Sequence, residues 1–223
     1  MIFILCHLTG YAQYKNFEKY DFYIEKAMLN LKDKNFKTAV NNFEKAFTIL
    51  DDESADDYFY AAAAALNCND FKKAEAFMRN AVVKTNAPKE YFLNFEALNK
   101  FRDNKVFSDV GDNYYAYQTH YLEQLKYPKI FLEIQNLCQR DQDARNSGLN
   151  YRTIDAQNIS RLMKITKEHG WQKGAWLLLW HQRVTYEDIN NPIWAYFKPL
   201  INDEIRRGKL EKTFGLDSKM RFR

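Results

Sequence analysis

The residues best suited to acid–base chemistry gather in the second half of the sequence. Residues 164–184, KITKEHGWQKGAWLLLWHQRV, contain two of the four histidines, His169 and His181. Imidazole titrates near neutral pH, so a histidine beside a carboxylate can act as a general acid or base or bind a metal. Asp141 is the carboxylate we expect beside them if the fold brings the three together. One hypothesis is therefore an enzyme with catalytic residues His169, His181 and Asp141.

Each histidine also has a structural interpretation. His169 precedes Gly170, and an imidazole at a helix C-terminus is favoured by the helix dipole. His181 lies in an apolar stretch, where a buried histidine with one hydrogen bond is common. The neighbouring tryptophans are best interpreted as core, with an aromatic wall for sugar or peptide as the alternative. Because no H-E-x-x-H, paired C-x-x-C, glycine-rich phosphate loop or G-x-S-x-G occurs, we expect no metal and no cofactor.

Further polar residues are spaced to face the same region. Asp141 and Arg145 are four residues apart and share a helix face. Asp155, Asn158 and Arg161 recur at steps of three on the next expected helix. These two stripes predict either a structural network or a cleft in which Arg145 orients a histidine or clamps an anion. The candidate ligand-binding residues are Arg145, Asp155, Asn158 and Arg161.

Four helices are expected to position these residues. Pro128 is the predicted domain boundary, because the residue before a proline is disfavoured in helix. Apolar residues at helical spacing and capping signals give the bounds. The expected helices are residues 129–145; residues 153–170, with Thr153 or Asp155 as N-cap and Gly170 at the end; residues 174–184; and residues 191–208, with Asn191 as N-cap, Pro192 first and a kink at Pro199.

The first half contains an internal repeat. Residues 31–47 align with residues 66–82 at a shift of 35. Small residues at fixed steps let two antiparallel helices approach closely, and large ones fill the gap between hairpins. The spacing therefore predicts an array of helical hairpins. Its first helices are residues 20–32 and 55–67, and a degenerate third unit combines residues 90–102 with residues 108–125.

These residues resemble the tetratricopeptide repeat, whose second helix carries A-x-x-x-[FY]-x-x-A and whose period is about 34 residues. The resemblance implies a concave face, lined by the first helices, that binds peptides or partner proteins. The alternative is that the C-terminal half of the chain covers this face. On this register the residues expected to contact a partner are Ile24, Met28, Phe59 and Leu66.

The second half resembles a bacterial domain family of unassigned function. The matching stretches are DQDAR at 141–145, NISRLMKITKEHGW at 158–171 and AWLLLWH at 175–181. The family signature runs D-x-x-x-R, N-x-x-R-L-x-x-I-x-x-x-H-G-W-P and A-x-W-L-x-x-Q-H, and the match covers about residues 130–208. A glutamine replaces the family's proline, and a tryptophan precedes the last histidine. Because the family has no established reaction, the resemblance indicates positions rather than chemistry.

Composition and termini suggest a cellular location. The net charge of +4, from 33 basic and 29 acidic residues in 223, gives little support for nucleic-acid binding. Residues 1–12 are predicted to be a possible truncated signal peptide, although they also suit the first turn of a helix. We therefore expect a periplasmic or secreted protein, with a cytoplasmic one as the alternative. No segment is apolar for long enough to span a membrane.

Together these observations predict an all-α protein with few helix breakers. Residues 13–128 form the repeat array, residues 129–208 a small helical domain and residues 209–223 a basic, solvated tail. The expected function is protein or peptide binding by a scaffold. The alternative is an enzyme that uses His169 and His181 with Asp141 and Arg145.

Overall fold

The computed structural model confirms the all-α fold. It describes residues 3–50, 54–148, 150–186, 188 and 190–207 of the chain, with side chains from residue 16 onward, and none of these residues lies in a β-strand. The chain divides into two compact units, built mainly on residues 11–125 and 126–207. Gly208 and the predicted basic tail lie outside the described residues, as do the first two positions of the predicted signal peptide.

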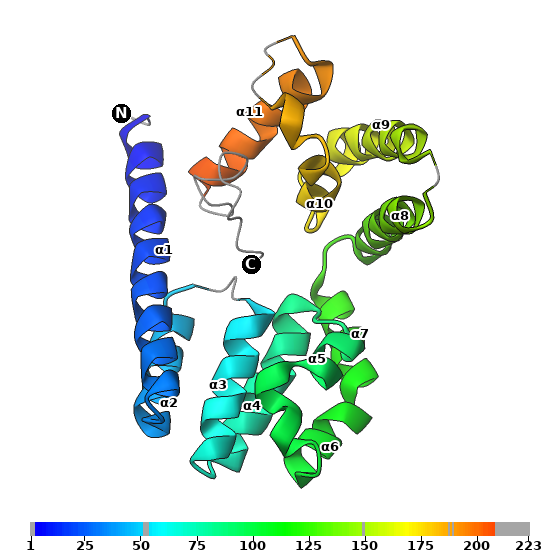
Figure 1. The fold of residues 1–223 in the computed structure, drawn as a ribbon. Helices are drawn as coiled ribbons and strands as arrows, with labels where there is room; N and C mark the ends of the chain where they lie inside the picture. Colours follow the sequence, from blue (N-terminus) through cyan, green and yellow to red (C-terminus); the bar gives the residue numbers. More distant parts are fainter. Residues whose placement is uncertain (1–2, 51–53, 149, 187, 189, 208–223) are drawn as a thin grey trace. The chain divides into compact units, whose positions relative to one another are not determined.

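The first unit is a succession of helices joined by short turns (Figure 1). Side-chain caps set two helix starts: Ser54 accepts from the N–H of Asp56, and Asp70 accepts from that of Lys73. In the third predicted hairpin both helices are divided, at Phe95 and at Asn113. The elements are α1 (Phe3–Lys32), α2 (Phe36–Phe47), α3 (Ala55–Asn67), α4 (Phe71–Thr85), α5 (Lys89–Asn94), the 3-10 helix η1 (Glu96–Phe101), α6 (Lys105–Asp112) and α7 (Tyr114–Gln124).

The turns before α2 and α4 have the same backbone geometry. Lys34 and Asn69 both have positive φ, 61° and 60°. In each case the N–H donates to the carbonyl three residues earlier at 3.1 Å. Asn104, another 35 residues along, makes the same bond at 2.9 Å, but its backbone is extended and its side chain caps α6. Equivalent hydrogen bonds therefore recur at the spacing of the sequence repeat.

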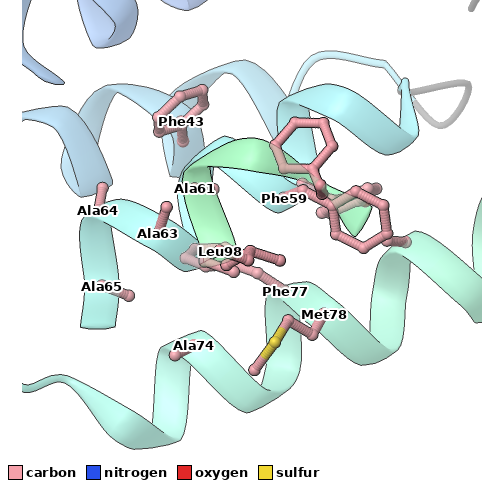
Figure 2. Close-up of a cluster of buried hydrophobic side chains, with 14 of the residues drawn as sticks. Phe43, Phe59, Ala61, Ala63, Ala64, Ala65, Ala74, Phe77, Met78 and Leu98 are labelled. Atoms are coloured by element: carbon pink, nitrogen blue, oxygen red, sulfur yellow. The ribbon is translucent and has the colours of Figure 1, made fainter. Parts of the chain in front are cut away.

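Small side chains on α3 form the centre of the first unit's core. Each of Ala61–Ala65 is at most 2% exposed, and Phe43 of α2 and Met78 of α4 are fully buried. Figure 2 shows these large side chains gathered around the alanines. Because alanine needs so little space, the neighbouring helices pack closely on α3 and the larger residues fill the remaining volume.

The expected partner-binding residues lie in or against this core. Ile24, Phe59 and Leu66 are 6%, 0% and 2% exposed. Met28 is partly buried and packs against the same cluster. The ring of Phe59 is covered by that of Phe95, with centroids 5.1 Å apart. The next hairpin thus closes the face that the sequence pattern led us to expect open, at least around Phe59.

The first helix of the second unit, α8, begins at Pro128. Two predicted helix ends are confirmed, since Gly170 (φ 75°) ends α9 and Asn191 caps α11 by accepting from Ile193 N–H. The predicted N-cap of α9, Thr153 or Asp155, was three to five residues late, because Asn150 is its N-cap. The third helix is shorter than expected, and Pro199 does not interrupt the last one. The elements are α8 (Pro128–Asn146), α9 (Tyr151–His169), α10 (Ala175–Trp180), the 3-10 helix η2 (Arg183–Thr185) and α11 (Pro192–Arg206).

The core of this unit includes one of the four tryptophans. Trp194 is 2% exposed, and its indole N–H donates to the carbonyl of Gln182 at 3.1 Å. Trp171, Trp176 and Trp180 are only partly buried. Across the described helices of both units, none combines the length and apolar character needed to cross a membrane.

Candidate functional site

Helices α8 and α9 bring three of the predicted polar residues into contact. Asp141 is 3% exposed and lies beside Arg145 on α8. The guanidinium of Arg145 donates to both carboxylate oxygens of Asp141, at 3.2 and 3.3 Å. It also donates to both oxygens of Asp155 on α9, at 2.7 and 2.9 Å. One cation therefore holds two carboxylates from two helices.

His181 joins this group from the end of α10. Its Nε2 lies 3.0 Å from Oδ2 of Asp141. The two side chains form an ion pair when the imidazole is protonated. The amide nitrogen of Gln142, which can only donate, lies 3.4 Å from Oδ2 of Asp141 and 3.4 Å from Nε2 of His181. We call Asp141, Arg145, Asp155 and His181 the carboxylate–imidazole cluster.

The surroundings shift the protonation equilibria of the cluster. Burial lowers the pKa of His181, with Arg145 and Arg183 acting in the same direction and Asp141 opposing them. Burial raises the pKa of Asp155, as does its hydrogen bond with Asp141, although Arg145 counteracts both. The pKa of Arg145 is raised because hydrogen bonds to the two carboxylates outweigh its burial. At neutral pH the imidazole is therefore neutral and the guanidinium charged.

Asn158 and Arg161, the other predicted ligand-binding residues, make different contacts. Asn158 is 1% exposed, and its amide donates to the carbonyl of Leu137 at 3.1 Å. Its Oδ1 is buried without a hydrogen-bond partner among the described residues. Arg161 pairs with Glu133, and this hydrogen bond is the main reason that the pKa of Glu133 is lowered. Asn158 thus joins the two helices, while Arg161 belongs to a separate ion pair.

His169 lies far from the cluster. Its ring contacts that of Tyr127, with centroids 4.8 Å apart, just before the start of α8. Asp141 is fourteen residues further along α8, which at 1.5 Å per residue is about 20 Å. The two histidines therefore do not share a site, and His181 alone accompanies Asp141.

Nearby cysteine does not add a ligand or nucleophile. Burial, followed by the charge of Asp141, raises the pKa of Cys138 to about 12, so the thiol stays protonated at neutral pH. No group of three His, Cys, Asp or Glu side chains within the described ranges is arranged to hold a metal ion. The chemistry available at the cluster is that of imidazole and carboxylate.

A second candidate surface lies in the first unit and was not predicted as a site. Tyr60 on α3 packs its ring edge-on against Phe95, with centroids 5.0 Å apart. The pKa of Tyr60 is raised by burial and then by nearby carboxylates, Asp56 first. Tyr91 is 41% exposed and donates its hydroxyl proton to Asp56. We call Asp56, Asp57, Tyr60, Tyr91 and Glu96 the tyrosine–carboxylate surface.

The sequence held a partial signal for this surface. Asp56 lies on the first helix of the second predicted hairpin, residues 55–67, and Tyr91 follows it by one repeat of 35 residues. Within the described part of the chain, neither Asp56 nor Glu96 forms an ion pair. The surface therefore combines aromatic rings with two carboxylates, Asp56 and Glu96, that form no ion pair within the described residues.

No family model, curated protein or solved structure matches the chain. Both resemblances noted in the sequence stay predictions.

Proposed function

We propose that the protein is a helical scaffold whose first unit binds a basic segment of a partner protein. The observation that carries the proposal is the tyrosine–carboxylate surface, where aromatic rings and carboxylates adjoin on α3, α5 and η1. Arginine and lysine side chains bind such surfaces through ion pairs with the carboxylates and through cation–π contacts with the rings.

The helical repeat supports the same proposal. Tetratricopeptide-like arrays use their first helices for binding, and Asp56, Tyr60 and Tyr91 all belong to first helices of the expected hairpins. The sequence led us to expect that Phe59 and Leu66 contact the partner. The proposal does not use them, because both side chains are buried. The partner is then recognised by carboxylates and aromatic rings rather than by apolar side chains.

Peptide titration tests the proposal. A fluorescein-labelled decapeptide of alternating arginine and glycine is titrated with the full chain, beside a serine–glycine peptide of equal length. We expect the arginine peptide to bind and the serine peptide not to. Asp56→Asn with Glu96→Gln should weaken binding about 5-fold, because two exposed ion pairs together contribute about 1 kcal/mol.

The matched control removes the same number of charges elsewhere. Asp103 and Asp112 are exposed residues of the same unit, so Asp103→Asn with Asp112→Asn changes the net charge equally. This control should leave the affinity unchanged. Equal weakening by both pairs would mean that the peptide senses only the net charge, and absence of binding to the wild type would refute the proposal.

Export remains part of the proposal for location. The apolar residues 1–12 suit the h-region of a signal peptide. The measurement is the intact mass of the protein recovered from a periplasmic fraction after expression with its natural start. A mass lower by the first twelve residues supports export, whereas a full-length mass found only in the cytoplasm contradicts it.

A further inference from the structure

The aromatic rings of the tyrosine–carboxylate surface differ from other rings of the same unit. Tyr60 and Tyr91 both stand nearly perpendicular to the ring of Phe95, at 72° and 83°. Elsewhere in the unit, rings such as Phe101 and Tyr115 have a lysine ammonium over them. No described lysine or arginine lies over the three rings at this surface. The surface thus has the aromatic half of a cation–π contact without its cation.

The basic residues of the same elements are engaged elsewhere. The sequence of α3 contains no lysine or arginine. Lys89 of α5 lies over the ring of Tyr115, 4.7 Å from its centroid. Lys100 of η1 lies over the ring of Phe101 and donates to Oδ1 of Asn67 at 2.6 Å. The surface therefore remains free to bind a cation that α3, α5 and η1 do not supply.

The free acceptor atoms lie on two carboxylates from two elements. Oδ1 of Asp56 accepts the hydroxyl proton of Tyr91, whereas Oδ2 has no hydrogen-bond partner among the described residues. Glu96 is exposed and forms no hydrogen bond with any of them. Burial raises the pKa of Tyr60, and the charges of Asp56 and Glu96 raise it further, so both carboxylates act on this ring. A cation at Tyr60 therefore has acceptors on α3 and on η1.

A guanidinium fits this arrangement better than an ammonium. It is planar, and its N–H donors form a rigid fork, so it can stack on a ring while it donates to separate acceptors at its edge. The ammonium of lysine is compact and strongly hydrated, so moving it from water onto a ring costs more. Because Tyr91 occupies one oxygen of Asp56, the fork is best satisfied by the other oxygen together with Glu96.

We propose that the tyrosine–carboxylate surface selects arginine over lysine in the partner segment, with Tyr60 as the ring on which the guanidinium stacks. Asp56 and Glu96 accept its N–H groups, and Tyr91 is a positioning residue, because its hydroxyl fixes the carboxylate of Asp56. The inference rests on the proposed function and adds to it the residue type that is recognised. It also implies regulation by the partner: methylation of the arginine keeps the charge but removes N–H donors, and so weakens binding.

Three peptides of equal length and charge test the selectivity. They are fluorescein-labelled decapeptides in which glycine alternates with arginine, with lysine or with asymmetric dimethylarginine, and each is titrated with the full chain. We expect the arginine peptide to bind about 2- to 5-fold more tightly than the lysine peptide, which is the range that one exposed cation–π contact supplies. The dimethylated peptide should bind less tightly than the arginine peptide.

Two tyrosine variants locate the selectivity. Tyr60→Leu should make the arginine and lysine peptides bind equally, because the stacking ring is lost. Tyr115→Leu is the matched control, since Tyr115 is a 66% exposed tyrosine of the same unit that already has Lys89 over its ring. This control should keep the preference for arginine. If Tyr60→Leu fails to fold, Glu96→Gln replaces it, and the loss of this exposed acceptor should weaken the arginine peptide more than the lysine peptide.

The outcomes separate this inference from the proposed function. Equal affinities of the arginine and lysine peptides for the wild type would overturn the inference and leave the proposed function standing. A preference retained in Tyr60→Leu, or equal weakening of both peptides in Glu96→Gln, would also overturn it. So would tighter binding of the dimethylated peptide, because the rings would then hold the cation without N–H donation to the carboxylates. Absence of binding by the arginine and lysine peptides alike would refute the proposed function and the inference together.

Discussion

Replacing Arg145 by methionine removes the cation that joins α8 to α9. The substitution keeps most of the side-chain volume but leaves Asp141 and Asp155 facing each other without a counter-charge. Breaking a buried ion pair by removing one partner costs about 3–5 kcal/mol. Because the Arg145 side chain is 24% exposed and that of Asp155 is 14% exposed, we expect the lower end, about 3 kcal/mol. This corresponds to a fall of about 12–24 °C in the Tm of the second unit, which has the size of a small domain.

Tryptophan fluorescence is the appropriate assay, because all four tryptophans lie in the second unit. Thermal unfolding followed in this way reports that unit without interference from the first. The penalty should grow with rising pH. Loss of Arg145 removes the influence that lowers the pKa of Asp155, so the folded variant holds a proton there that it must release as the pH rises.

Arg140→Met provides the matched control on the same helix. The guanidinium of Arg140 is exposed and makes only a 3.4 Å contact with Gln157, so its loss should change stability by less than about 0.5 kcal/mol. A loss below about 1 kcal/mol in Arg145→Met, or one that is the same at pH 4 and pH 7, would refute the description of the cluster as a buried network joined by this cation.

Other residues give three further predictions. Met78→Ala should destabilise the first unit by about 2–5 kcal/mol, because it leaves a cavity in the core; far-UV circular dichroism during urea unfolding measures this, with exposed Arg79→Ala as the control. Gly174→Ala should cost more than Gly148→Ala: both have positive φ, but only at Gly174 would the new Cβ lie 3.3 Å from Gln135. Thermal unfolding compares the two. Cys138 should react with Ellman's reagent far more slowly in the folded chain than in urea, since burial raises its pKa to about 12.

Local signals predicted the helices well where one factor dominated. Asn191 followed by Pro192 marks a helix start, because proline needs no hydrogen-bond partner at the first position, and α11 begins there. Gly170 marks a helix end, because glycine adopts positive φ without strain. The start of α9 was missed, since asparagine and threonine are both common N-cap residues and Asn150 begins the helix without a side-chain cap hydrogen bond.

Exposure was much harder to predict than secondary structure. The apolar face of α3 suits either an open concave surface or the interior of a short array, and the sequence alone does not distinguish them. Phe59 is buried because Phe95, 36 residues later, covers it. That contact depends on the break between α5 and η1, which turns the third hairpin in a way that no periodicity indicates.

Sequence spacing predicted part of the cluster for a clear reason. Asp141 and Arg145 are four residues apart on one helix, so they share a helix face however the helices pack. Their contact could therefore be predicted without knowledge of the fold. The choice between His169 and His181 did need it. His169 is 28 residues from Asp141 in the sequence and His181 is 40 residues from it. Because α8 and α9 run antiparallel, His169 lies at the opposite end of the hairpin from Asp141.

Stability by itself is a weak reason for such a cluster. Apolar residues of similar volume often replace a buried ion pair without loss, or with a gain, because the charges must be removed from water. Two carboxylates on one guanidinium leave the group short of one positive charge, and the neutral imidazole of His181 does not supply it. A network selected only to join α8 and α9 would more simply use one carboxylate and no histidine. The second carboxylate and the histidine are therefore the features of the cluster that packing alone does not explain.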